Sequence, residues 1–371
     1  MKLTVDARAL KAALARLSGV ISSRHHIPVL AMVHIEAGDG LRLRGSDADT
    51  HALSDCPAAV AVRGAVCAPY AEIAKLAAAA GSAEIEIEAS GNVLRLTWGR
   101  SSASLLTIDP EDFPKAWGNP ALLQPVDGDL FAAALNYCAP AMSTEEARYY
   151  LRGAHIEPHE GGTRFAATDG HRLHIATTPM NAFGGPVILG TREVALAAAV
   201  AGGGGPFRLY LSAEKWGCAS DGIEVWGKTV DGSFPDIVRV IPRDPEFIAT
   251  VDSADLVAAI GTAAIGTDGG AEKRASVTIR AAGDRIGIQG SGGGALAQGV
   301  STEIPADVQH ECVIKLAARY AVDALRAMPG DFVSIHDGGS IALLEPAEQR
   351  AEMRCSAVIM GMRTAEAVRA A

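Results

Sequence analysis

The chain repeats one pattern of helices and hairpins three times, and this internal repeat constrains its fold more than any other feature. A Val-Asp pair precedes an apolar stripe with helical spacing at residues 5–17, 126–137 and 251–263. The aspartates of these pairs, Asp6, Asp127 and Asp252, lie 121 and then 125 residues apart. Each stands where an N-cap carboxylate accepts hydrogen bonds from the first turn of a helix. The spacing therefore predicts three related helices, each beginning after its aspartate.

Each copy continues in the same order, with a hairpin followed by a second helix. Short alternating segments flank turn residues, and we expect hairpins at residues 33–44, 155–166 and 277–288. Second helices are predicted at 71–80, 192–201 and 317–328. The fold class predicted is α+β, with three repeated domains at 1–121, 124–246 and 247–371. Each domain has two helices packed on antiparallel sheets.

Composition agrees with several aliphatic cores and excludes some classes of protein. The 371 residues are too many for one ordinary core, and 49% of them are hydrophobic while only 5% are aromatic. No run of 18 uncharged apolar residues occurs, and the first residues lack the apolar segment of a signal peptide. We therefore expect a cytoplasmic protein that does not cross a membrane.

Charge and cysteine usage narrow the classes further. A net charge of −10 argues against a protein that grips nucleic acid over its whole surface, but it allows basic residues on one inner face. No C-x-x-C spacing connects the cysteines, so we expect reduced, buried thiols and neither a disulfide nor a metal site. The cysteines are Cys56, Cys67, Cys138, Cys218, Cys312 and Cys355.

A histidine in the middle copy invites a catalytic interpretation. The segment Thr168-Asp169-Gly170-His171 aligns with Ser46-Asp47-Ala48-Asp49 of the first copy, so both predict a turn after a strand. His171 and Arg172 occur only in the middle copy. No nucleophile signature such as G-x-S-x-G accompanies His171. A strand would place His171 and His174 on opposite faces, which disfavours a shared metal. We predict no catalytic residue, no metal site and no cofactor.

Motifs spread along the whole chain resemble those of the bacterial sliding clamps, the processivity subunits of replicative DNA polymerases. They occur in the order of that family. The motifs are Arg100-Ser101-Ser102 before Asp112-Phe113-Pro114, Arg148-Tyr149-Tyr150-Leu151, Ala167-Thr168-Asp169-Gly170-His171-Arg172-Leu173, Phe234-Pro235-Asp236 before Arg239-Val240-Ile241-Pro242, and Met360-Gly361-Met362-Arg363.

The resemblance implies a ring formed by a head-to-tail homodimer and a pocket that captures short peptide motifs. Apolar and methionine side chains suit leucine- and phenylalanine-like anchors of several partners. Matching the family motifs residue by residue gives the pocket Leu151, Thr168, Gly170, His171, Arg172, Leu173, Pro235, Arg239, Val240, Tyr320, Val358, Met360, Met362 and Arg363.

The same resemblance implies partners and two further contact regions. Arg24, Arg148, Tyr149 and Tyr150 would touch double-stranded DNA without reading its sequence, and Arg100 and Ala103 would lie at the dimer interface. The partners implied are the polymerase catalytic subunit, the clamp loader and other proteins that carry clamp-binding motifs. The protein would be non-catalytic, a DNA-encircling processivity factor that slides along duplex DNA.

The chain also departs from the family pattern at several positions. Arg274 and Ala317 replace an aromatic residue and an asparagine that are common in the pocket, and Gly361 replaces a proline in the last motif. Residues 365–371 extend past the family's usual end. These departures keep open an alternative function, a divergent accessory or plasmid clamp that acts mainly as an interaction platform. A second alternative is an enzyme that uses His171 as its base.

Overall fold

The structure is a computed structural model that describes residues 1–22, 26–115, 117–181, 184–265, 275–291 and 299–362. Its contacts form two compact units, which we describe separately. The first comprises Met1–Asp129 and Ala195–Thr229, and the second comprises Leu130–Val194 and Val230–Ala371. Helices α3 (Gly128–Cys138) and α4 (Thr191–Ala201) each contribute residues to both units.

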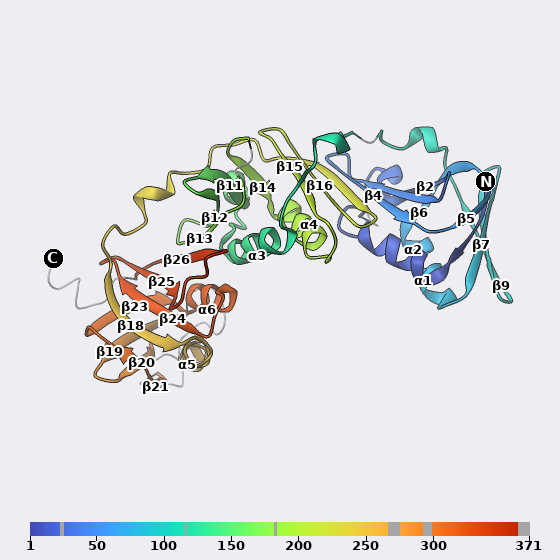
Figure 1. The fold of residues 1–371 in the computed structure, drawn as a ribbon. Helices are drawn as coiled ribbons and strands as arrows, with labels where there is room; N and C mark the ends of the chain where they lie inside the picture. Colours follow the sequence, from blue (N-terminus) through green and yellow to red (C-terminus); the bar gives the residue numbers. More distant parts are fainter. Residues whose placement is uncertain (23–25, 116, 182–183, 266–274, 292–298, 363–371) are drawn as a thin grey trace. The chain divides into compact units, whose positions relative to one another are not determined.

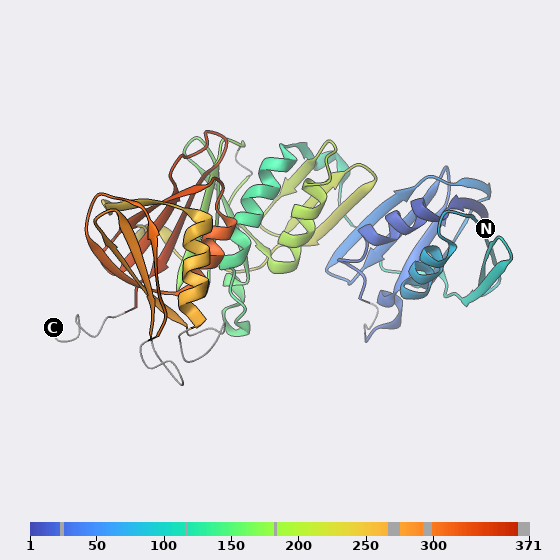
Figure 2. The ribbon, with the colours of Figure 1, turned by 90° about the horizontal axis from the view of Figure 1, so that it is seen from below.

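The first unit places helices α1 (Ala7–Arg16) and α2 (Tyr70–Ala80) side by side (Figure 2). One antiparallel sheet has the order β5-β1-β7-β8-β9, and the other has the order β10-β15-β16-β17-β4-β3-β2-β6. The strands are β1 (Lys2–Asp6), β2 (Met32–Ala37), β3 (Leu41–Ser46), β4 (Thr50–Cys56), β5 (Ala59–Val62), β6 (Gly64–Pro69), β7 (Glu84–Ser90), β8 (Val93–Trp98), β9 (Ser101–Leu106), β10 (Gln124–Pro125), β15 (Arg208–Leu211), β16 (Lys215–Ser220) and β17 (Ile223–Lys228). Short 3-10 turns are η1 (Pro28–Ala31), η2 (Pro110–Asp112) and η3 (Pro120–Leu122).

Strand β7 shows why these segments form half-buried strands. Ile85 and Ile87 are buried, whereas Glu84, Glu86 and Glu88 between and beside them are exposed. Successive side chains of a strand point to opposite faces, so this alternation gives the sheet one apolar face and one charged face. The apolar face is the one that forms the core.

The second unit is built in the same way around helices α5 (Ser253–Ile265) and α6 (Ala318–Ala327), which lie side by side (Figure 1). One sheet has the order β14-β11-β12-β13-β26-β25-β24-β18-β22, and the other has the order β21-β20-β19-β23. The strands are β11 (Gly153–His159), β12 (Gly162–Thr168), β13 (Arg172–Thr178), β14 (Val187–Gly190), β18 (Glu246–Asp252), β19 (Ser276–Ala282), β20 (Arg285–Gly290), β21 (Ser301–Pro305), β22 (Asp307–Val308), β23 (Cys312–Ala317), β24 (Phe332–Asp337), β25 (Ile341–Pro346) and β26 (Arg354–Met360). The 3-10 turns are η4 (Ala139–Ala141), η5 (Glu146–Leu151) and η6 (Ile237–Arg239).

Each large sheet is continuous across segments that are distant in the sequence. Strand β13 pairs with β26, with Leu173 opposite Val358, and β4 pairs in the same antiparallel manner with β17. Main-chain hydrogen bonds therefore join the middle third of the chain to the last third along the β13–β26 seam. This seam positions the candidate site.

The structure confirms the repeated α+β pattern. The hairpins β2–β3, β11–β12 and β19–β20 fall on the predicted segments, and the six predicted helices are α1 to α6. The carboxylate of Asp6 accepts hydrogen bonds from the N–H groups of Arg8 and Ala9, and that of Asp252 accepts one from Asp255. Both aspartates thus cap their helices as expected. Asp127 directly precedes α3.

Three further features concern the sequence predictions. In the described residues, no helix is long and apolar enough to cross a membrane. The cysteines are free, and all except the half-buried Cys312 are buried. The glycine-rich segment after β20 lies largely outside the described residues, as do Arg24, Arg274 and Arg363.

Candidate functional site

The turn between β12 and β13 is held by side chains that bond to its own backbone. The hydroxyl oxygen of Thr168 accepts a hydrogen bond from the N–H of Gly170 at 3.0 Å. The carboxylate of Asp169 accepts from the N–H groups of His171 and Arg172 at 2.9 and 3.1 Å. Gly170 has a φ of +88°, which favours glycine. The turn is therefore rigid, and it fixes where β13 begins.

The first copy of the repeat contains the same turn. Ser46 accepts from the N–H of Ala48 at 3.0 Å, and Asp47 accepts from Asp49 and Thr50 at 3.0 and 2.6 Å. Ala48 has a φ of +83°, and among the described residues it is the non-glycine residue with a positive φ. The structure thus confirms that the two segments occupy one structural position.

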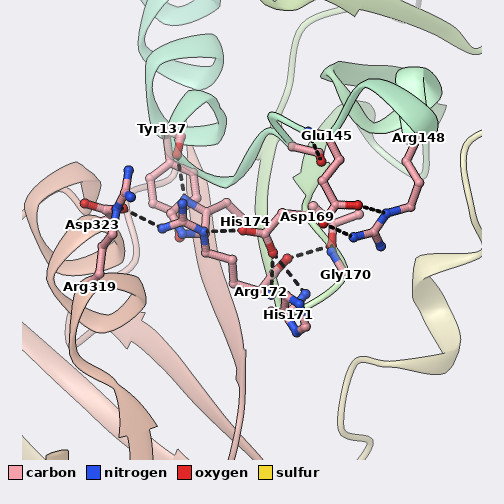
Figure 3. A network of polar contacts seen from close by, with 12 residues as sticks. Tyr137, Glu145, Arg148, Asp169, Gly170, His171, Arg172, His174, Arg319 and Asp323 are labelled. Carbon is pink, nitrogen blue, oxygen red and sulfur yellow. Dashed lines mark hydrogen bonds and ion pairs between the residues drawn. The ribbon is translucent and has the colours of Figure 1, made fainter. Parts of the chain in front are cut away.

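Arg172 lies at the centre of a buried polar network (Figure 3). Its Nε is 3.1 Å from Asp169 Oδ2, and its Nη1 is 2.7 Å from Asp323 Oδ2 on α6. The guanidinium carbon also lies 4.5 Å from the centre of the Tyr320 ring. The Arg172 side chain is only 5% exposed. It therefore joins the β12–β13 turn to α6, whereas the sequence interpretation expected it to hold a peptide.

His171 and His174 lie in unlike surroundings. His171 is exposed, and its ring is nearly parallel to that of Tyr320, with 6.2 Å between centroids. His174 is fully buried, and its Nδ1 lies 2.9 Å from the carbonyl oxygen of Tyr137, to which it donates in that tautomer. Burial lowers the pKa of His174 to about 4. His174 is thus a neutral core residue at pH 7 and is not placed to act as an acid–base catalyst.

A cavity of about 520 Å³ opens beside this turn, on the outer face of the β13–β26 seam. Most of the predicted pocket residues line it, namely Leu151, Thr168, Gly170, His171, Arg172, Leu173, Pro235, Arg239, Val240, Val358 and Met360. The other lining residues are Arg148, Tyr150, Asp236, Ile237, Ser340 and Ile341.

The floor of the cavity is apolar because several strands contribute outward-facing side chains to it. Leu173 on β13 and Val358 on β26 are paired across the seam, and both are buried in a cluster with Leu343 on β25. Met360 stands at the rim and is 52% exposed. An exposed, flexible methionine above a buried aliphatic floor suits apolar side chains of varied shape.

One wall is formed by an irregular segment, residues 234–241, that crosses the outer face of the sheet. Ile237 is buried in the same cluster, while Val240 is 49% exposed toward solvent. Asp236 caps η6 by accepting from the N–H of Val238, and it also pairs with Arg239 at 2.9 Å. This wall presents an apolar residue and a cation to the cavity.

Two of the predicted pocket residues that the structure describes do not line the cavity. Tyr320 lies behind the turn, where it packs on His171 and Arg172. Met362 lies beyond the end of β26, not on that strand as alternation suggested, and its N–H donates to the carbonyl of Lys315 at 2.7 Å. Arg363 lies outside the described residues.

One lining residue that sequence reasoning missed comes from a strand paired to a predicted one. Ile341 on β25 lies opposite Met360, so alternation along β25 places it on the same face as Leu343. The alternating run Ile341-Ala342-Leu343 was the available signal. It did not reveal the register of β25 against β26, on which the assignment depends.

Three of the residues predicted to contact DNA lie on η5, which borders this cavity. The guanidinium of Arg148 is held by Glu145, with Nε 2.8 Å from Oε2. Tyr149 is 54% exposed, and its ring meets that of Tyr150 edge-on at 5.8 Å. Arg148 and Tyr150 also line the cavity, which the sequence did not predict. Arg24 lies outside the described residues.

The residues predicted at the dimer interface lie at a sheet edge. Arg100 directly precedes β9, and Ala103 lies in the middle of this edge strand. Leu106 at its end is 71% exposed. An edge strand with an exposed leucine offers unpaired main-chain groups and apolar surface to a partner strand.

No group of three or more histidine, cysteine, aspartate or glutamate side chains that could hold a metal ion occurs in the described part of the chain. The cluster of acidic and basic residues around Arg172 is instead satisfied by its own ion pairs.

Comparison with known proteins agrees with this geometry. Residues 1–116 match the N-terminal domain, and residues 125–236 the central domain, of the DNA polymerase III beta subunit family. The chain is 33% identical over 269 residues to the beta sliding clamp of Caulobacter vibrioides, a match that covers 68% of this chain and 72% of the relative. It is 27% identical over 378 residues to that of Salmonella typhimurium, covering 98% and 100%.

Solved structures extend the likeness to the whole fold. A crystal structure of the Caulobacter crescentus clamp superposes with a TM-score of 0.88 at 28% identity, covering 98% of this chain and 99% of that one. The fold and the site therefore define a DNA-clamp protein. The chain belongs to the bacterial beta sliding clamp family. It is a non-catalytic processivity clamp of DNA polymerase, so DNA and the polymerase are its partners, and the homodimeric ring is consistent with this fold.

Proposed function

We propose that the cavity beside the β12–β13 turn captures short peptide segments of the proteins that this clamp tethers to DNA. These proteins include the polymerase catalytic subunit, the clamp loader and other carriers of clamp-binding motifs. The observation that carries the proposal is the apolar floor of Leu173 and Val358 beneath an exposed rim of Val240 and Met360. Leucine and phenylalanine anchors would bury apolar surface there.

Ligands of related clamps support this proposal. One Caulobacter crescentus clamp structure contains polyethylene glycol in a candidate beta-motif tethering region, and one Pseudomonas aeruginosa clamp structure contains griselimycin. Polar groups of a peptide would meet Arg239 and the exposed ring of His171 at the cavity rim. In this proposal Arg172 shapes the site from below and does not bind the peptide.

We further propose that the chain encircles duplex DNA as a head-to-tail homodimer with domains at 1–121, 124–246 and 247–371, in the cytoplasm. Tyr149, Tyr150 and Arg148, together with Arg24, would contact phosphates and sugars without reading bases. Arg148 would have to exchange its Glu145 partner for phosphate. Such exchange keeps binding weak enough to allow sliding.

Retention on circular DNA tests the clamp function. The protein is loaded on nicked circular DNA with a clamp loader and filtered through a gel matrix. A ring is expected to remain on circles and to leave after a restriction enzyme linearises them. Equal loss from circles and from linear DNA would contradict topological binding.

Titration with a fluorescein-labelled peptide that carries leucine and phenylalanine anchors tests the cavity. Val240→Ala removes apolar surface from the wall and is expected to raise the Kd roughly three- to tenfold. Val238→Ala is the matched control, because Val238 is also exposed on η6 but does not line the cavity. Equal affinities for the two variants would overturn the assignment of the peptide to this cavity.

A further inference from the structure

The wall formed by residues 234–241 lies outside any strand, which raises the question of what fixes its position. Phe234 at its start packs flat against His155 of β11, with ring centroids 4.6 Å apart and an interplanar angle of 6°. Phe234 also packs against the apolar cluster that contains Leu173 and Ile237. The aromatic contact therefore joins the wall to the sheet just before it reaches the cavity.

The first copy of the repeat contains a looser, tilted contact between the equivalent residues. His34 of β2 lies against Phe113, with centroids 5.5 Å apart at 52°. Both histidines lie on the first strand of their hairpin, and both phenylalanines precede a proline in the segment that follows the last long strand of the copy. A contact repeated at equivalent positions is a property of the repeated unit, not an accident of one loop.

The polar surroundings of the two histidines are also repeated. A glutamate follows two residues later on the same strand and pairs with an arginine of the next strand. Glu157 accepts from Arg164 Nε at 2.7 Å, and Glu36 lies 3.5 Å from Arg44. Each pair lies beside its histidine. In the first copy Arg44 also contacts both ring nitrogens of His34, at 3.1 and 2.9 Å, whereas Nδ1 of His155 has no hydrogen-bond partner among the described residues.

Burial keeps both rings uncharged at pH 7. It lowers the pKa of His34 to about 4, and it lowers the pKa of His155 despite the opposing effect of Glu157. The Nδ1 atom of His155 makes no hydrogen bond within the described residues. A neutral ring with an unused nitrogen contributes to the fold mainly through its faces.

We propose that His155 and Phe234 form a clasp that positions the wall of the peptide cavity, so both are positioning residues for peptide binding. The inference rests on the proposed function of the cavity. Pro235 directly follows Phe234, and its ring fixes its own φ. The position of Phe234 therefore determines where the lining residues that follow it begin. The clasp of His34 and Phe113 fixes a segment that does not line the cavity.

Two pairs of matched variants test the clasp. His155→Gln and Phe234→Leu remove the stacked contact of the second copy, and His34→Gln and Phe113→Leu remove the tilted contact of the first. The Kd of the labelled leucine–phenylalanine peptide is measured for each variant, together with Tm. Hydrogen exchange of residues 235–241 is followed by mass spectrometry as a readout of the wall that is independent of any peptide.

Loss of an aromatic contact of this kind should raise the Kd of the peptide about three- to tenfold in the two variants of the second copy. Their wall should exchange faster. The two first-copy variants should bind like the wild type even where their Tm falls equally. His155→Phe keeps a flat ring against Phe234 and should restore binding to within about twofold of the wild type.

The outcomes separate the clasp from the proposed function. If the wild type does not bind the peptide, the proposed function of the cavity fails. Hydrogen exchange of residues 235–241 is then the measurement that tests the clasp. If the wild type binds and the variants of both copies lose affinity alike, the loss is general destabilisation and the clasp is refuted. Unchanged affinity and unchanged exchange in the second-copy variants would refute it equally.

Discussion

Removal of Arg172 should destabilise the protein more than it disturbs any bound peptide. The guanidinium is almost fully buried between Asp169 and Asp323, at 3.1 and 2.7 Å, and it lies over the Tyr320 ring. Truncation of one partner of a buried ion pair typically costs about 3–5 kcal/mol, because the remaining charges lose their compensation. Asp323 is 27% exposed, so water compensates part of this loss. We therefore expect about 3 kcal/mol for Arg172→Ala.

The assay is a double-mutant cycle with Asp323→Ala, followed by thermal unfolding. A loss of about 3 kcal/mol corresponds to a fall in Tm of roughly 6–12 °C for a unit of this size. The double variant should lose less than the sum of the single variants, with a coupling of about 1.5–3 kcal/mol. Arg319→Ala is the control, because Arg319 lies 3.6 Å from the same Asp323 Oδ2 but is 53% exposed. It should cost less than about 1 kcal/mol.

The result that would refute this reasoning is a specific one. Suppose that Arg172→Ala kept the Tm of the wild type, that its effect on stability were additive with that of Asp323→Ala, and that it lost only peptide affinity. The guanidinium would then be available to the ligand. Its burial between two carboxylates would then be energetically unimportant.

Three further predictions concern other parts of the molecule. Burial lowers the pKa of His174 in the folded state to about 4, so as the pH falls below about 6.5 the unfolded chain takes up a proton that the folded chain does not. Roughly 2 kcal/mol of stability should therefore be lost between pH 7.5 and 5. Urea unfolding of His174→Gln should show a smaller loss over the same range. Leu106→Asp places a charge on the exposed end of β9 and should shift sedimentation from dimer to monomer, whereas Leu122→Asp, at an exposed position outside the strand, should leave the dimer intact. Asp6→Ala removes the cap of α1 and should cost about 1 kcal/mol in urea unfolding, while Asp6→Asn should cost less, because its amide oxygen can still accept from Arg8 and Ala9; equal costs would contradict the capping role.

The repeated architecture was predictable because its signals are local. A carboxylate before a helix, an alternating strand and a turn residue each act within a few positions, and the repeat presents each signal three times. The β12–β13 turn illustrates this, since the alignment of Asp47 with Asp169 predicted a shared turn, and the structure confirms it in the backbone N–H groups that donate to the two aspartates.

The roles of individual site residues were less predictable because they depend on contacts between distant segments. Arg172 was expected to face a peptide, but Asp323 meets it from 151 positions away in the sequence. Neither residue carries a local pattern that identifies the other. Tyr320 and Met362 were misplaced for the same reason, since the packing of α6 and the end of β26 decide their positions.

A comparison of the β13–β26 seam with the equivalent β4–β17 pairing of the first unit explains why a cavity opens at one copy of the repeat. Alignment of the turns makes Leu173 equivalent to His51, and the cross-strand partners of these two residues are Val358 and Trp226. In the first unit, the ring of Trp117 packs edge-on against His51 at 5.5 Å and joins the buried Trp226 in one cluster. Large aromatic rings thus cover the face that Leu173 and Val358 leave open.

This comparison assigns the function of the site to side-chain volume and not to backbone. Both seams have the same antiparallel pairing, and in both turns the backbone donates the same hydrogen bonds to the aspartate. The indole of Trp226 takes up far more space than the two methyl groups of Val358, and the ring of Trp117 covers the same face, so close packing leaves no room for a ligand there. The repeat therefore supplies two equivalent platforms, and the absence of such rings at the β13–β26 seam leaves one of them open as the cavity that we propose receives the anchors of a partner.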